Sequence, residues 1–137
     1  MVVPTNAGVG SAIGFLRAPV AYDVVRSHNM RLGEFNAATI NALIEEMRAA
    51  VGNRPVYLCW DMDVFDPSCA PGVCDPTWGG MTAREGIAIL RSLAGMNIVS
   101  VDVNTVSPPH DSAGMTALLA ANVMILALHL LCMREEA

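Results

Sequence analysis

The chain has 137 residues, of which 53% are hydrophobic and 15% are charged, and its formal net charge at pH 7 is −5. This balance excludes a disordered segment, which needs low hydrophobicity and high charge, and it fits one domain with a buried core. The eight basic residues are all arginine and are scattered along the chain. Because so little is present to neutralise phosphate, we expect no nucleic-acid surface.

The cysteine pattern indicates reduced thiols. No two cysteines form a CxxC pair, and the first residues do not have the pattern of a signal peptide. We therefore expect a cytoplasmic protein whose thiols are mostly small buried hydrophobes. The four cysteines are Cys59, Cys69, Cys74 and Cys132.

The first half of the chain predicts one helix and one strong strand. Residues 1–35 are weakly patterned by glycine and proline, with a short strand near residues 11–16. Apolar residues then recur at three- and four-residue steps over residues 36–51, which predicts a helix that ends at Gly52. The continuous apolar run over residues 55–60 is typical of a central parallel strand that is buried on both faces.

The second half repeats the alternation of helix and strand. A loop over residues 66–80 is rich in proline, glycine and cysteine, and loops of this length inside compact domains are usually functional. Thr82 and Glu85 match a capping box that opens a helix through Leu93, and residues 97–103 form the next strand. This order predicts an α/β fold with a mostly parallel sheet.

The last predicted helix lies in residues 113–133, which include no charged residue. That length could span a bilayer. However, the segment contains Thr116, Asn122 and His129 and has no flanking basic cluster. A helix packed on a sheet or between subunits has the same signature, so we expect a buried helix and no membrane, and we keep a small membrane protein as the minor alternative.

Polar side chains follow both predicted strands. Asp61 and Asp63 end the first strand, and Asp102, Asn104 and Thr105 end the second. Ligands of open parallel sheets bind beyond the carboxyl ends of the strands. Residues two apart on an extended chain point to the same side, so the first two carboxylates would repel each other unless a cation such as Mg, Ca or Mn lies between them. The alternative is that these aspartates cap a turn.

Two histidines have different expected roles. His110 follows two prolines in a loop after the second strand, where it could line a pocket. His129 lies on the apolar helix and is predicted to be a core or interface histidine with a satisfied hydrogen bond.

The same region carries an ordered series of motifs. The stretch Tyr57–Pro67 reads YLCWDMDVFDP, and it is followed by Ala-Pro-Gly at 70–72, by Gly-Gly-Met at 79–81 and by Val-Ser-Pro-Pro at 106–109. Together these motifs resemble the signature of the ureohydrolase (arginase–agmatinase) family, most closely its agmatinase branch. The resemblance is strong over residues 55–131 and weak before them.

This resemblance implies a fold, a cofactor and a reaction. The fold is a three-layer α/β/α domain around a mostly parallel sheet, assembled as a homo-oligomer, and residues 1–137 would form a single partial domain of this kind. The family site holds two Mn²⁺ ions bridged by a hydroxide, and it hydrolyses a guanidino compound such as agmatine to urea and an amine. By position, Asp61 resembles the aspartate that bridges the two ions, and Asp63 resembles a terminal ligand of one of them.

The sequence departs from the family pattern in two places. The Gly-Gly-Asp-His and Asp-x-His-x-Asp stretches that supply the other family ligands are not in this sequence. The family commonly has a Glu two residues before the Ser/Asn-Pro pair, where it contacts the guanidinium, and this sequence has Thr105 there, after Asn104. We expect substrate contacts from Thr105, Asn104 and His110, and a metal held by Asp61 and Asp63. The alternative is a non-catalytic truncated homologue or assembly subunit that keeps the family core.

Overall fold

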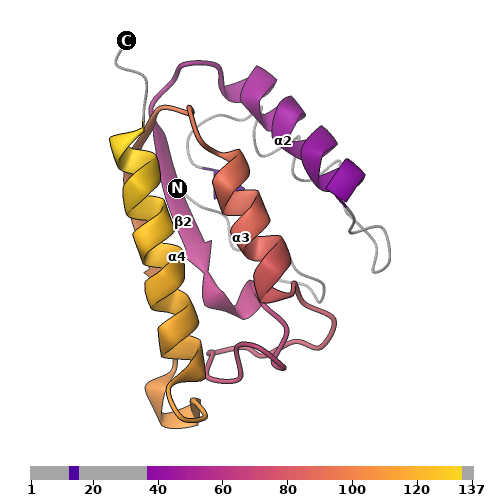
Figure 1. Cartoon of the computed structure of the whole chain (residues 1–137), viewed down its shortest axis with the longest axis vertical. Coiled ribbons are helices and arrows are strands. Elements are labelled where there is room, and N and C mark those ends of the chain that lie inside the picture. Colours follow the sequence, from indigo (N-terminus) through magenta and orange to yellow (C-terminus); the bar gives the residue numbers. More distant parts are fainter. Residues whose placement is uncertain (1–12, 16–36, 134–137) are drawn as a thin grey trace.

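The alternation of helix and strand expected from the sequence is present in the structure, a computed structural model that describes residues 13–15 and 37–133 (Figure 1). The order of elements confirms the α/β class of the fold, here as part of a domain. The elements are β1 (Ile13–Phe15), α2 (Ala37–Val51), β2 (Val56–Asp61), the 3-10 turn η1 (Met62–Val64), α3 (Ala83–Ser92), β3 (Ile98–Asn104), the 3-10 turn η2 (Pro108–His110) and α4 (Met115–Cys132).

Strand β2 lies at the centre of the described sheet. It pairs with β3 in parallel and with β1 in antiparallel orientation, so the expected parallel arrangement holds for the β2·β3 ladder. The register places Cys59 beside Asp102 and Asp61 beside Asn104. Because side chains alternate along a strand, these four lie on one polar face of the ladder. The apolar side chains of both strands lie on the other face: Leu58, Trp60, Val101 and Val103.

The helices cover the apolar face. Helix α4 lies along β3, α3 lies beside α4, and α2 contacts α3 (Figure 1). Trp60 is 1% exposed and belongs to one core cluster with Ile89 of α3 and Val123 of α4. The apolar spacing of the sequence therefore gives a single core between sheet and helices.

The ends of the helices follow the expected signals. Helix α3 begins after a capping box, in which the Thr82 hydroxyl accepts from the Glu85 N–H (3.3 Å) and the Glu85 carboxylate accepts from the Thr82 N–H (2.8 Å). Helix α2 ends at Gly52, whose φ of 59° is in the left-handed region.

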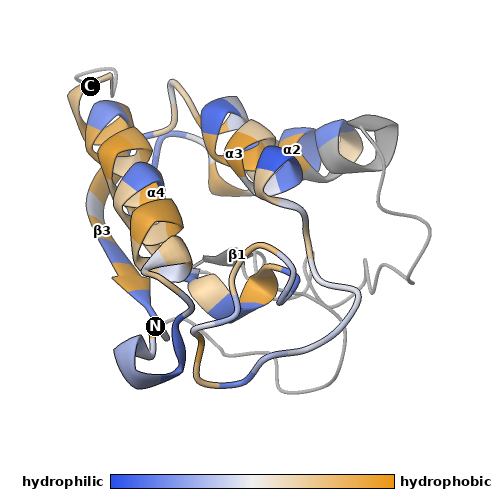
Figure 2. Ribbon diagram, turned by 60° about the horizontal axis from the view of Figure 1, so that its bottom comes forward, coloured by the Kyte–Doolittle hydropathy of each residue, from blue (hydrophilic) through white to orange (hydrophobic). Residues whose placement is uncertain are grey.

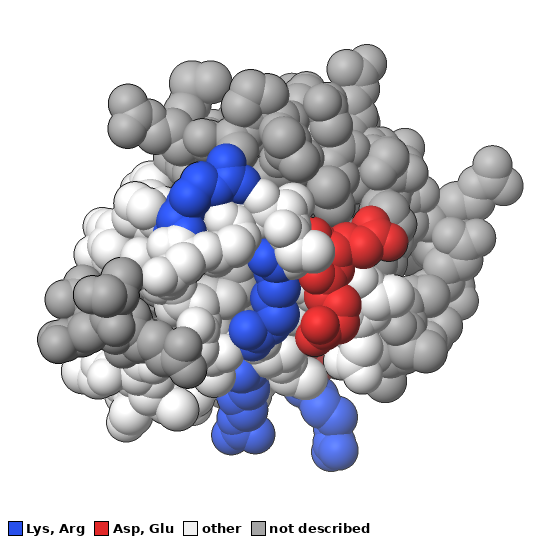
Figure 3. All heavy atoms as spheres, turned by 90° about the horizontal axis from the view of Figure 1, so that it is seen from above, with Lys and Arg blue, Asp and Glu red and all other residues white. Residues whose placement is uncertain are grey.

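Arg48 of α2 donates to the Ser92 carbonyl at the end of α3 (2.5 Å). Arginine and acidic side chains lie next to each other on the face shown in Figure 3.

Helix α4 is apolar on most of its circumference, as Figure 2 shows. Leu118, Ile125 and Leu128 are 66%, 54% and 50% exposed, and their spacing of seven and three residues places them on one outer stripe. Of the described helices, α4 alone is long and apolar enough to cross a membrane, and only 22% of it is buried. The expectation of a buried helix is therefore wrong for the described part of the chain by itself, although length and composition alone do not establish a membrane span.

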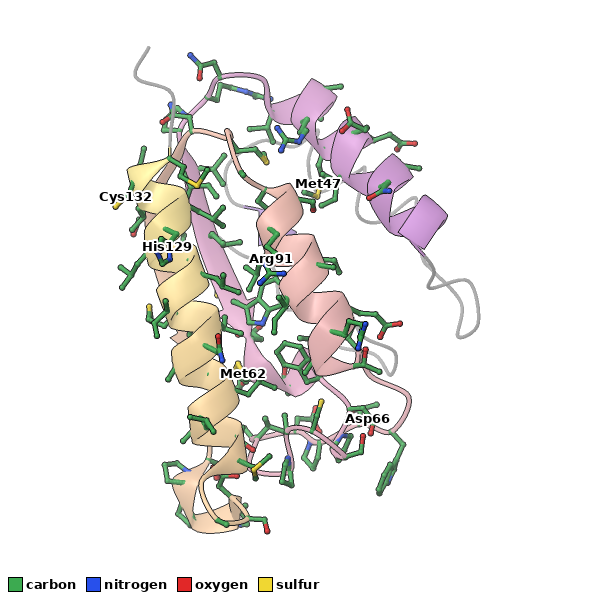
Figure 4. The ribbon with its side chains drawn as sticks, in the orientation of Figure 1. Met47, Met62, Asp66, Arg91, His129 and Cys132 are labelled. Atoms are coloured by element: carbon green, nitrogen blue, oxygen red, sulfur yellow. The ribbon has the colours of Figure 1, made fainter. Side chains whose placement is uncertain are left out.

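His129 does not enter the core. Its side chain is exposed on α4, and its ring Nδ1 lies 2.8 Å from the Ile125 carbonyl oxygen of the same helix (Figure 4). The expectation of a satisfied hydrogen bond is therefore confirmed, and the expectation of burial in the core is wrong for the chain by itself. The reason is that α4 turns this side away from the sheet.

Candidate functional site

The two candidate metal ligands lie at the carboxyl end of β2. Asp61 is the last residue of the strand, and Asp63 lies in the η1 turn that follows. The strand geometry that we used to place both on one side therefore ends at Asp61 and does not apply to Asp63. The two carboxylates still influence each other. Burial raises the pKa of Asp63 most, and the charge of Asp61 and then that of Asp75 raise it further.

A chain of polar contacts leads from β3 to Asp61. The Asn104 amide donates to Asp102 Oδ1 (2.6 Å) and to Cys59 Sγ (3.0 Å), and Cys59 Sγ lies 3.9 Å from Asp61 Oδ1. Burial raises the pKa of the Cys59 thiol, and the neighbouring Asp61 raises it further. The thiol therefore keeps its proton and can donate it toward the Asp61 carboxylate.

Two of the candidate substrate residues, Thr105 and His110, already have hydrogen-bond partners within the chain. The Thr105 hydroxyl accepts from the Asp63 N–H (3.1 Å) and donates to the Asn104 carbonyl (2.7 Å). His110 is exposed in η2, and its Nδ1 lies 2.7 Å from the Ser107 hydroxyl. The structure thus brings Thr105 and Asn104 to the Asp61–Asp63 end of the sheet and gives His110 a partner in its own turn.

The long loop over residues 66–80 is closed at its base. Met81 and Phe65 form a parallel bridge, in which the Asp66 N–H donates to the Met81 carbonyl (2.8 Å). The Asp66 carboxylate accepts from the N–H groups of Ser68 and Gly79, both at 2.9 Å (Figure 4). The bonds from Ser68 and then from Gly79 lower the pKa of Asp66, so the carboxylate that closes the loop stays ionised.

The middle of the loop is tied to the chain after β3. The Ser107 N–H donates to the Gly72 carbonyl (2.7 Å), and the Cys74 N–H donates to the Thr105 carbonyl (2.9 Å). The Gly72 N–H in turn donates to the buried hydroxyl of Thr116 at the start of α4 (2.8 Å). The loop is therefore held in place by hydrogen bonds to the chain after β3 and to the start of α4.

Asp111 completes this junction. Its two carboxylate oxygens accept from the N–H groups of Thr116 and Ala117, at 2.9 and 3.0 Å, and so they satisfy the first turn of α4. The residue at the formal start of that helix, Gly114, has no capping side chain. An aspartate three residues earlier takes the capping role.

Cys59, which we expected only as a small buried hydrophobe, is buried and also contacts Asp61 and Asn104. The signal was its position two residues before Asp61 on the same strand face. The structure describes all four cysteines as free, and Cys74 and Cys132 are exposed, so the expectation of buried thiols is wrong for these two. Both lie where apolar cover is thin, in the loop and on the outer side of α4.

The described residues do not complete a metal centre. Within residues 13–15 and 37–133, no group of three or more His, Cys, Asp or Glu side chains is placed to hold an ion. Asp61 and Asp63 therefore fit a metal only as part of a ligand set. Burial and then the charges of Asp61 and Asp75 raise the pKa of Asp63, so these carboxylates lie in a region of like charge.

Comparisons with known proteins identify the family. The arginase family matches residues 16–129. An agmatinase of Sodalis glossinidius is 38% identical over 98 residues, which cover 72% of this chain and 32% of that protein. A guanidinopropionase of Pseudomonas aeruginosa is 40% identical over 107 residues, which cover 78% of this chain and 33% of that protein.

The fold comparison agrees. The structure of proclavaminate amidinohydrolase from Streptomyces clavuligerus matches with a TM-score of 0.68 and 35% identity, over 85% of this chain and 40% of that one. Arginase from Bacillus subtilis matches with a TM-score of 0.64 and 26% identity, over 78% of this chain and 40% of that one. The chain spans about a third of the length of the curated relatives above. It belongs to the arginase family.

Proposed function

We propose that this chain carries one part of the site of a metal-dependent amidinohydrolase, which splits a small guanidino compound into urea and an amine. The observation that carries the proposal is the pair Asp61 and Asp63 at the end of the central strand of an arginase-family chain. The named relatives act on different guanidino compounds, as agmatinase and guanidinopropionase. The shared chemistry is the guanidino group, and we propose that group, with agmatine as the first candidate, as the substrate class.

We further propose Mn²⁺ as the ion. Carboxylate oxygens are hard ligands that suit Mg, Ca and Mn. Burial and then the Asp61 charge raise the pKa of Asp63, and a divalent cation between the two carboxylates would offset both effects. The remaining ligands of a binuclear centre would come from outside the described residues or from another chain. We also propose that the protein is a homo-oligomer and that it is cytoplasmic.

The proposal is tested by metal binding and urea release. The full chain should bind Mn²⁺ no tighter than roughly micromolar in calorimetry, since few fixed ligands give little binding free energy. D61N and D63N should abolish this binding, whereas D75N, which changes a nearby exposed carboxylate, should weaken it less. Tight binding of two ions by the isolated chain would contradict the partial site.

A urea assay over agmatine, 3-guanidinopropionate and 4-guanidinobutyrate should then be run with Mn²⁺. Urea release that D61N abolishes would support the hydrolase. No urea from any compound would favour the second candidate, a non-catalytic homologue or assembly subunit. That candidate is supported by the incomplete ligand set of the described residues and by the apolar outer stripe of α4.

A further inference from the structure

Thr105 has an unusual backbone conformation at the end of β3. Its φ is 67°, in the left-handed region, although Thr is branched at Cβ. Side chains of this kind rarely adopt positive φ, because Cβ approaches the following carbonyl. A strained residue of this type persists only where its surroundings hold it, so the contacts of Thr105 indicate what the strain maintains.

The contacts join three segments of the site. The Thr105 hydroxyl accepts from the Asp63 N–H (3.1 Å), which links β3 to the turn after β2. The same hydroxyl donates to the Asn104 carbonyl (2.7 Å), and this bond fixes its rotation. The Thr105 carbonyl accepts from the Cys74 N–H (2.9 Å) and thereby holds the long loop.

We propose that Thr105 is a positioning residue: its hydroxyl holds the turn that carries Asp63. The donor of the hydroxyl and one of its two acceptor lone pairs are already used, toward the Asn104 carbonyl and the turn of Asp63. The left-handed backbone by itself would favour Gly, and what Thr adds is the hydroxyl. The functional meaning of this role rests on the proposed function, in which Asp63 is a metal ligand.

Hydrogen exchange of the Asp63 amide in the full chain, followed by NMR, tests the proposal. T105A should lower the protection factor of this amide roughly five-fold, the usual effect of losing one neutral hydrogen bond. T105G should do the same while relieving the backbone strain, so it remains informative if T105A does not fold. T105S keeps a hydroxyl and should restore the protection. The Cys74 amide should stay protected in T105G, because its acceptor is a backbone carbonyl.

The matched control is T116A. It removes the other threonine hydroxyl that accepts from a loop N–H, that of Gly72, and it should expose the Gly72 amide and leave Asp63 protected. Three results would each overturn the proposal: unchanged Asp63 protection in both T105A and T105G, loss of protection in T105S, or equal loss in T116A, which would indicate global opening. Failure of the proposed function would give a different result: the unsubstituted chain would not bind Mn²⁺, while the differences in Asp63 amide exchange between the variants would remain as predicted here.

Discussion

At Gly72 the loop lies close to Asp111 in the chain before α4, and Gly72→Ala should disturb both segments. The Cβ of an alanine there would lie 2.4 Å from Asp111 Cβ and 2.5 Å from Asp111 Cα. Part of this contact is with backbone, so no side-chain rotation relieves it. Either the loop or Asp111 must move by about 1 Å to reach the 3.4 Å of an ordinary contact.

The cost follows from what such a movement breaks. Overpacking by one methyl group in a well-packed site destabilises by about 1–3 kcal/mol. We expect the upper half of this range, because Gly72 is buried and its N–H and carbonyl are both bonded, to Thr116 and Ser107. A shift of Asp111 also removes the acceptors of the first turn of α4, so that turn should fray.

Urea denaturation followed by circular dichroism gives the loss of stability, and amide exchange at Thr116 and Ala117 gives the fraying. Gly52→Ala is the comparison, since a Cβ there meets nothing within 4 Å and the change adds only the strain of a left-handed alanine. A loss for G72A no larger than that for G52A, with unchanged exchange in α4, would refute the reasoning. It would mean that the loop moves freely and is not a fixed wall of the site.

Three further changes test separate features. In the metal-free chain, burial and then Asp61 raise the pKa of Asp63, so the charged form of Asp63 costs stability once the pH rises through its folded-state pKa. D63N should therefore raise the free energy of unfolding at pH 7, measured by urea denaturation, by up to about 1 kcal/mol. A lower free energy of unfolding in D63N would contradict this prediction. Burial would raise the pKa of Asp111, but the N–H donors of Ala117 and Thr116 outweigh it and lower that pKa from the usual value of an aspartate. The stabilisation from Asp111 is therefore present above the usual pKa of an aspartate and is lost as the pH falls through the folded-state pKa. D111N should make the melting temperature less dependent on pH between about pH 5 and pH 2. An unchanged pH dependence of the melting temperature would contradict the capping role of Asp111. The double change L118E/I125E should convert an oligomer into a smaller species in light scattering, and a monomeric unsubstituted chain at micromolar concentration would disprove the predicted assembly.

The element boundaries could be predicted to within about two residues because their signals are local. The apolar run before Asp61 gave β2, and the Thr82–Glu85 pair gave the start of α3, which the capping box confirms. Helix propensity and capping depend on residues within about one helical turn of each other, so the spacing of residues in the sequence is enough to predict them. The error at Asp63 has the same origin: a period of two holds only while the chain is extended, and here the chain turns into η1 directly after Asp61.

The contacts of the site could be predicted only in part because they join distant segments. Placing polar residues at the ends of both strands required only the rule for parallel sheets. The chain from Asp102 through Asn104 and Cys59 to Asp61 also requires the register of β2 against β3, which the sequence does not state. Thr105 has a left-handed backbone and accepts from the N–H of a residue 42 positions away, and neither feature has a local signal in the sequence.

The two incompletely covered surfaces of the described part differ in what they require. The polar face of the β2·β3 ladder satisfies many of its groups internally, through the bonds of Asn104 to Asp102 and Cys59. The outer stripe of α4 has no such solution, because apolar side chains are stabilised only by contact. Fully burying one leucine or isoleucine contributes about 1.5–3 kcal/mol, and Leu118, Ile125 and Leu128 are still 66%, 54% and 50% exposed, so about half of that gain or more remains for each of them on association. Association should therefore be driven by α4 and be separable from the proposed metal ligands, and L118E/I125E should change assembly without changing the weak Mn²⁺ binding that we propose for Asp61 and Asp63 within one chain.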